Sequence, residues 1–202
     1  KGYWRLTGAN IYSGPTTVRN GKLIVNGTHT GAGKVTVQSG ATLTGIGKLP
    51  GATEILSGGT LSAGDPTLAT PTIGTFSTGA LTLQSGSITS LRITASSADR
   101  IVSTGAITYG GTLNLTIPDN LTAGKQFALF TGTSHSGSFQ NIVPESPGAD
   151  LAWEFAGGIL KVVSATGLKE ARSLPVQLSQ NPVQDRFEIS FDKSQEEVRI
   201  TV

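Results

Sequence analysis

The chain has 202 residues, including 27 glycines, and only 14% of its residues are charged, against about 25% in an ordinary globular domain. Its net charge of +2 comes from scattered residues, which gives no support to binding of nucleic acid or of an anionic membrane. The absence of cysteine excludes disulfides, thiolate metal ligands and a cysteine nucleophile. Low charge with a hydrophobic share of 37% predicts many thin strands joined by glycine-rich turns.

Short strands recur along the first part of the chain. A glycine followed by alternating apolar and polar residues is found at 21–25, 33–37 and 79–83. Variants that open with Ser-Gly lie at 39–43, 57–61 and 85–88. Alternation with period two predicts strands with one buried face, and the Gly, Ser, Asn and Asp residues between them predict turns. We find no helical apolar stripe in the first 160 residues, which argues against crossover helices.

Two all-β architectures fit this pattern. The strands are very short, and a single-stranded parallel β-helix (a solenoid) needs only a few inward apolar side chains per strand, because neighbouring turns of the chain bury them. An antiparallel β-sandwich would need longer strands and a richer core. The solenoid is therefore the expected fold, and the sandwich is the alternative.

The chain changes character at about residue 113. Further strands are predicted at 113–117, 124–130, 137–139, 151–155 and 158–163. Large aromatic side chains gather in this region, namely Phe127, Phe130, Phe139, Trp153 and Phe155. A solenoid must cover its last turn to stop edge-to-edge growth. We therefore expect a repeat domain over 1–163 whose part from about 113 is an aromatic cap.

The remaining residues predict a linker and the start of another unit. Residues 164–175 have the composition of a linker, and 176–202 form an acidic segment with a turn at 180–182. Two strands are predicted there, at 187–191 and 198–202. Because a lone two-stranded unit is marginally stable in water, we expect 176–202 to be the opening part of a β-sandwich-like domain.

A segment near the N-terminus resembles a known repeat. The sequence LTGANIYSGPTTV at 6–18, followed by NGKLIV at 20–25, is similar to the autotransporter-associated β-strand repeat, although Pro15 stands where that family usually has a second glycine. The resemblance implies a right-handed parallel β-helix in an exported passenger protein. Residues 127–163 also resemble the closing portion that often follows such repeats.

A second resemblance lies at the other end. The sequence LSQNPVQDRFEI at 178–189, with its turn at Asn181, Pro182 and Val183, is similar to the opening of the C-terminal sorting domain of the Bacteroidetes type IX secretion system. Ser-Gln replaces the Tyr-Pro that is usual before that turn. The resemblance implies a cargo protein that meets the secretion machinery through its tail. Such a protein is secreted or displayed at the cell surface, associated with the outer membrane.

The acidic and basic residues offer no catalytic centre. Up to residue 125 the carboxylates are Glu54, Asp65, Asp99 and Asp119, and no cluster of them suggests paired acids or a calcium site. Asp99 is followed by Arg100, and because adjacent strand residues point to opposite faces, we expect a turn with solvated charges. The sequence predicts no catalytic residue, no metal site and no cofactor.

The histidines and the N-terminal aromatics complete the candidates. His29 and His135 each lie among Thr, Ser and Gly, which predicts surface loops. Tyr3 and Trp4 are candidates for stacking on a sugar ring, but covering the open end of the solenoid is the favoured interpretation.

The resulting hypothesis is a non-catalytic structural or adhesive segment of an exported surface protein, with a glycan or host-surface ligand as its partner. The alternatives are an accessory β-helix region of a secreted polysaccharide-degrading enzyme and a carbohydrate-binding module. The sequence contains no run of apolar residues long enough for a transmembrane helix.

Overall fold

The computed structural model describes residues 2–65, 73–118 and 121–165. Within these residues the protein is all-β and contains no helix. The chain divides into two compact units, Lys1–Ser164 and Ala165–Val202, and every described strand belongs to the first.

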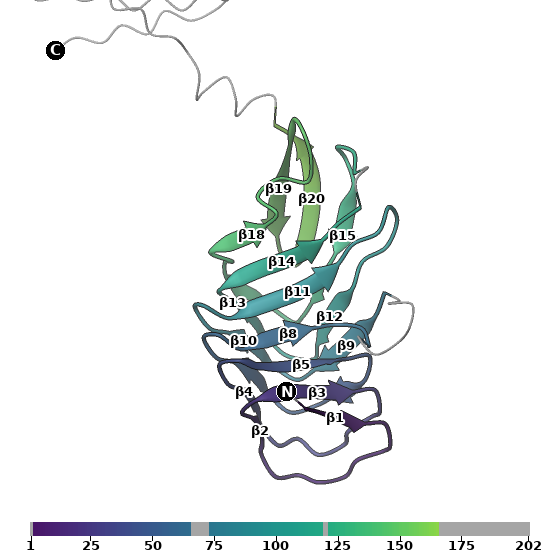
Figure 1. Ribbon diagram of the computed structural model, residues 1–202, viewed down its shortest axis with the longest axis vertical. Helices are drawn as coiled ribbons and strands as arrows, with labels where there is room; N and C mark the ends of the chain where they lie inside the picture. The colour runs from purple at the N-terminus through teal and green to yellow at the C-terminus, as the bar shows by residue number, and fades with distance from the viewer. Residues whose placement is uncertain (1, 66–72, 119–120, 166–202) are drawn as a thin grey trace, which may run out of the picture. The chain divides into compact units, whose positions relative to one another are not determined.

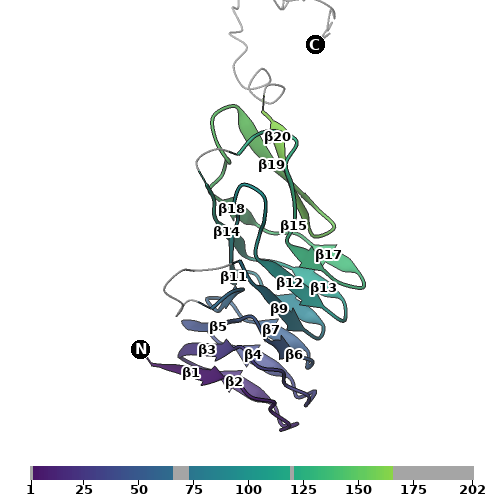
Figure 2. The ribbon, with the colours of Figure 1, turned by 90° about the vertical axis from the view of Figure 1, so that its right-hand side faces the viewer.

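Three parallel sheets make up most of this unit (Figures 1 and 2). The seven-stranded sheet runs in spatial order through β1 (Tyr3–Leu6), β3 (Gly21–Val25), β5 (Ala41–Gly45), β8 (Thr60–Ser62), β11 (Ile88–Arg92), β14 (Thr112–Thr116) and β18 (Asn141–Val143). The six-stranded sheet runs through β17 (His135–Gly137), β13 (Ile107–Tyr109), β10 (Leu81–Leu83), β7 (Thr53–Ile55), β4 (Val35–Val37) and β2 (Thr16–Val18). The four-stranded sheet runs through β16 (Phe130–Thr131), β12 (Arg100–Ser103), β9 (Thr75–Thr78) and β6 (Lys48–Leu49). None of these sheets closes into a barrel.

Within the three parallel sheets, strands that follow one another along the chain belong to different sheets. The strands β8, β9 and β10 lie in the seven-, four- and six-stranded sheets, and β11, β12 and β13 repeat that order. We call each such circuit a rung; the rungs span residues 3–18, 21–37, 41–55, 60–83, 88–109 and 112–137. Each rung pairs in parallel with the rungs before and after it, so the pairing is not that of the antiparallel sandwich.

Strand register aligns the inner side chains of successive rungs in columns. One column in the seven-stranded sheet consists of Leu23, Leu43, Leu61, Thr89 and Leu113. All five side chains are buried. Because each strand sends only one or two side chains inward and the next rung covers them, the low hydrophobic share of the sequence is enough to build a continuous core.

The turns stack as well as the strands. The amide of Gly40 donates to the carbonyl of Gly58, and the amide of Gly58 donates to that of Gly86, each over 2.9 Å. Gly58 and Gly86 have φ angles of 74° and 79°, a conformation that favours glycine. The stack ends at Gln140, whose side-chain oxygen accepts from the amide of Gly86 at 3.3 Å while its amide nitrogen donates to Ser85 Oγ at 2.8 Å.

An antiparallel sheet lies at the end of the unit opposite to β1 (Figure 1). It contains β15 (Gln126–Ala128), β20 (Ile159–Ser164) and β19 (Leu151–Ala156). The single strand predicted at 124–130 is wrong, because the chain changes sheet at Leu129. Here β15 pairs with β20, whereas β16 returns to the four-stranded sheet beside β12.

The aromatic side chains of the C-terminal region pack together at this end. Tyr109, Phe130, Phe139 and Phe155 form a cluster whose ring centroids lie 5.1–5.9 Å apart. Several pairs are edge-to-face, the arrangement that aromatic quadrupoles prefer. Trp153 donates its indole N–H to the carbonyl of Pro144 at 2.9 Å, so its polar group is satisfied.

Candidate functional site

Asp99 is a buried structural carboxylate, and the predicted turn with solvated charges is wrong. Its side chain is fully buried, and it pairs with Arg92, whose Nε lies 3.0 Å from Oδ2, rather than with the adjacent Arg100. The backbone amides of Gly74 and Arg92 also donate to it, at 2.7 and 2.8 Å. The carboxylate therefore ties the fourth rung to the fifth, which explains its burial.

Asp99 and Arg92 meet because the chain between them doubles back, with an antiparallel bridge between Ile93 and Ala98. The sequence signal was an acid seven residues after an arginine, and the alternation of a single strand does not bring residues at that spacing together. Arg100 instead points to the next rung and donates to Thr131 Oγ1 at 3.2 Å.

Asp65 is the second buried acid, with an exposed fraction of 3%. It accepts a hydrogen bond from Asn26 Nδ2 at 2.7 Å and lies 3.7 Å from Arg5 Nη2. These partners come from the second and first rungs, so the contact joins three rungs. A carboxylate held by its own cation and amide serves stability rather than proton transfer.

Glu54 lies on the outer face of the six-stranded sheet. Its carboxylate contacts Lys34 Nζ at 2.6 Å and accepts from Gln84 Nε2 at 2.8 Å. The hydrogen bonds from Lys34 and then Gln84 lower the pKa of Glu54 below its ordinary value. Asp119 lies outside the described residues. Among the residues that the structure describes, no three His, Cys, Asp or Glu side chains are placed to bind one metal ion.

His29 is buried in the wall of the stack, so the predicted surface loop is wrong. Its exposed fraction is 3%, and its ring lies under that of Tyr12, with centroids 4.1 Å apart. Thr28, the residue before it, forms an isolated parallel bridge with Lys48. The rungs therefore pair at this point without a full strand. Among the residues that the structure describes, none forms a hydrogen bond with the Nδ1 atom of His29.

His135 is also not in a surface loop. It opens β17 and pairs in register with the buried Ile107, which makes it half-buried at the edge of the aromatic cluster. Its Nδ1 lies 2.6 Å from the hydroxyl of Tyr109. Burial raises the pKa of Tyr109 far above its ordinary value. The hydroxyl therefore stays protonated, and it shares this hydrogen bond with Nδ1 of His135.

Tyr3 and Trp4 are exposed on β1, to 61% and 79% respectively. Trp4 pairs in register with Leu23, so it stands at the head of the inner column, yet its side chain covers little of the core. Ile11 and Tyr12, on the same rung, are 81% and 42% exposed. Sequence reasoning identified the first two of these residues and missed the others, whose exposure depends on which rungs, among the described residues, pair with their own.

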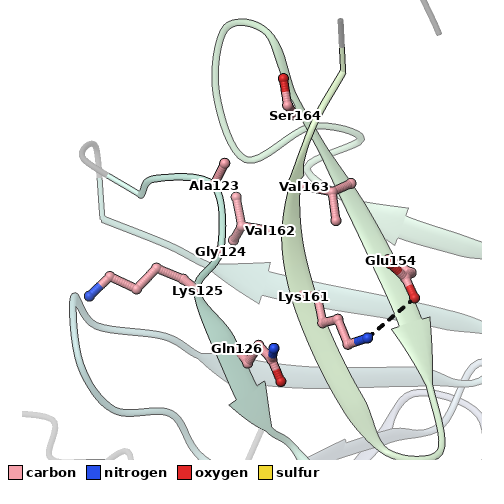
Figure 3. Close-up of a pocket in the computed structure, with 9 residues that line it drawn as sticks. All are labelled: Ala123, Gly124, Lys125, Gln126, Glu154, Lys161, Val162, Val163 and Ser164. Atoms are coloured by element: carbon pink, nitrogen blue, oxygen red, sulfur yellow. Dashed lines mark ion pairs between the residues drawn. The ribbon is translucent and has the colours of Figure 1, made fainter. Parts of the chain in front are cut away.

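A shallow groove lies along β20, next to the segment that leads into β15 and to Glu154 of β19 (Figure 3). Its volume is about 370 Å3, and its lining consists of Ala123, Gly124, Lys125, Gln126, Glu154, Lys161, Val162, Val163 and Ser164. Lys161 pairs with Glu154 at 3.5 Å, and Lys125 extends away from that pair. The charges therefore do not converge on one point.

The predicted sorting turn at Asn181, Pro182 and Val183, like most of the predicted linker, lies outside the described residues. In the described ranges, no helix has the length and apolar character needed to cross a bilayer.

The fold defines an all-β protein built mainly of parallel sheets. No protein-family model matches the sequence, and no curated protein matches it significantly.

Proposed function

We propose that the first unit is a right-handed parallel β-helix with an aromatic C-terminal cap, and that it serves as a non-catalytic structural or adhesive segment of an exported surface protein. The observation that carries this proposal is the unbroken parallel register of six successive rungs. Such a stack transmits force along a backbone ladder and presents a repeated outer surface, which suits a stalk or a contact surface.

The outer surface of the six-stranded sheet supports a role in presentation. One outward column consists of Thr17, Thr36, Glu54, Thr82, Thr108 and Ser136. Its members stand about 4.8 Å apart, the spacing of neighbouring strands. Five of its six members carry a hydroxyl group, and Glu54 interrupts the row. Such a polar row is well suited to hydrogen bonding with a polar polymer.

The resemblances supply the export part of the proposal. Residues 6–18 occupy most of the first rung and 20–25 include β3, the opening strand of the second, so the repeat-like segment spans one circuit and begins the next. The resemblance at 178–189 suggests type IX secretion in a Bacteroidetes cell, with the protein at the outer surface.

A carbohydrate-binding module is the second candidate, and one observation favours it. Tyr3, Trp4 and Tyr12 are exposed on one rung, and exposed aromatic faces stack on sugar rings. The accessory region of a polysaccharide-degrading enzyme remains an alternative proposal that this unit alone does not distinguish from a stalk.

Export is tested by placing the full chain behind a periplasmic leader in a Bacteroidetes host. We expect surface protein in cells with an active type IX system and periplasmic retention in cells without one. Replacing Asn181, Pro182 and Val183 with alanine should cause the same retention. Surface display that ignores both changes would refute the sorting proposal.

Adhesion is tested by coating beads with the purified chain and measuring their attachment to glycan surfaces and to cells. We expect attachment that survives Trp4→Ala if the rod's outer face makes the contact. Attachment to a glycan that Trp4→Ala abolishes would favour the carbohydrate-binding module instead. No attachment to any surface would leave only the stalk function.

A further inference from the structure

The outer face of the six-stranded sheet carries two neighbouring columns of short side chains. The strands of this sheet follow one another along the stack from β2 to β17 (Figure 2). Within a strand the inner side chains are buried, as Leu81 and Leu83 are in β10, so the residues between and beside them face outward. The first outward column is the polar row that runs from Thr17 to Ser136.

The second column lies two residues earlier along each strand. Backbone hydrogen bonds extend the parallel register to the residue before each strand. From the third rung onward the side chains at this position are small and exposed, namely Ala52, Ala80, Ala106 and Ser134. Neighbouring strands stand about 4.8 Å apart, and outward residues of one strand stand about 6.6 Å apart. The face therefore presents hydroxyl groups and methyl groups in a regular two-dimensional array.

This array carries no net charge. Glu54 is the acid in the first column, and Lys34 occupies the second column in the second rung. Lys34 Nζ contacts the carboxylate of Glu54 at 2.6 Å, and Gln84 Nε2 donates to the same carboxylate at 2.8 Å. The two charges therefore neutralise each other. From the fourth rung onward, neither column contains a charged residue.

Water is the ligand that this array fits. Neither column contains an aromatic side chain, so the stacking contact that a sugar ring makes with an aromatic face is missing. Hydroxyl groups both donate hydrogen bonds to water and accept them, and methyl groups restrict the orientation of the water beside them. Columns of both groups at fixed spacings favour an ordered layer of water with the same repeat.

We propose that the outer face of the six-stranded sheet binds to the surface of ice. Ice repeats its water molecules at spacings comparable to those of the array, so the ordered layer joins the crystal lattice. The paired charges and the short side chains leave the layer undisturbed over the later rungs. The inference uses the same outer face as the proposed function, but it does not depend on export or on adhesion to a polymer.

The test is the growth of a single ice crystal in a solution of the purified full chain. We expect the protein to enter the ice and to lower the freezing temperature below the melting temperature. Thr82→Tyr should abolish both effects, because a large ring would stand above the array. The matched control is Thr112→Tyr on β14. Thr112 is also half-buried, but it lies on the outer face of the seven-stranded sheet, so this variant should behave as the parent does.

A second variant keeps the proposal testable if Thr82→Tyr folds poorly. Ala106 is exposed in the other column, so Ala106→Lys changes no buried side chain, and it should also abolish ice binding. Exclusion of the parent from ice, parental behaviour of Ala106→Lys, or equal loss in both tyrosine variants would overturn the proposal.

Cosedimentation with crystalline cellulose and chitin distinguishes ice from a solid polysaccharide. We expect the parent to enter ice and to stay in solution with both polymers. Binding to a polymer that Thr82→Tyr removes, with no entry into ice, would overturn the inference and assign this face to the polymer adhesion of the proposed function.

Discussion

The two ends of the stack are built from the same kinds of residue and yet differ in burial. Trp4 and Tyr12 at the first rung are 79% and 42% exposed, whereas Tyr109 and Phe130 near the other end are 6% and 3% exposed. The difference lies in what covers them, because an antiparallel sheet packs over the second pair. An aromatic residue in a stacked fold therefore stabilises it only when a further layer closes the column.

The largest expected effect comes from removing an aromatic side chain at the covered end. Phe130→Ala should lower the free energy of unfolding by about 3–5 kcal/mol, because it leaves a cavity in the cluster. Trp4→Ala should change it by less than about 0.5 kcal/mol at low protein concentration, since its side chain is largely solvated. Urea unfolding measures both. Equal losses would show that the first rung is covered.

A smaller effect is expected from one buried hydrogen bond. Tyr109→Phe should cost about 1–3 kcal/mol, because the half-buried Nδ1 of His135 loses its hydrogen-bond partner. Tyr12→Phe is the matched change at the open end, where the hydroxyl accepts from Thr16 at 3.1 Å in an exposed contact. We expect this variant to unfold at nearly the parent's denaturant midpoint. A larger loss of stability in Tyr12→Phe than in Tyr109→Phe would contradict the expected difference between the two ends.

The turn stack provides a third comparison. Gln140→Ala should cost about 1 kcal/mol, because the amide of Gly86 and the hydroxyl of Ser85 lose their side-chain partner. At the other end of the stack, Asn10→Ala removes an exposed hydrogen bond from the side-chain amide of Asn10 to the carbonyl of Gly8. The thermal unfolding midpoint of this variant should change much less. In the Gln140→Ala variant, amide hydrogen exchange should become faster first at the turn of residues 84–87. Faster exchange spread over the whole unit would argue against a local cap.

The smallest effect concerns pH and the middle of the stack. Because its partners lower the pKa of Glu54 below the ordinary 4.5, this group stabilises the fold fully above that value, and the contribution is lost as the pH falls through the lowered pKa. For a partly exposed ion pair we expect less than about 1 kcal/mol. Glu54→Gln should make the free energy of unfolding depend less on pH in this range. The stability of the two ends of the stack should not change. An unaltered curve would mean that Glu54 has little effect on stability.

Much of the local structure followed from periodicity. The strand predicted at 21–25 is β3, and those predicted at 151–155 and 158–163 match β19 and β20 to within one residue at each end. The strand at 124–130 failed because alternation says nothing of which sheet a strand joins. The charge pair at Asp99 and Arg100 failed for a related reason, since a fold back through residues 93–98 brings Arg92 to the acid instead.

The sequence by itself indicated an all-β chain with a thin core, and it located β3, β14, β19 and β20 to within one residue at each end. These properties follow from alternation and turn residues, which act within a few positions of the chain. Only the tertiary structure decided that His29 and Asp99 are buried, that His135 meets Tyr109, and that Trp4 heads an uncovered column. Each of those outcomes depends on which residue of a neighbouring rung stands in register, and the rungs differ in length, so no fixed spacing in the sequence encodes it.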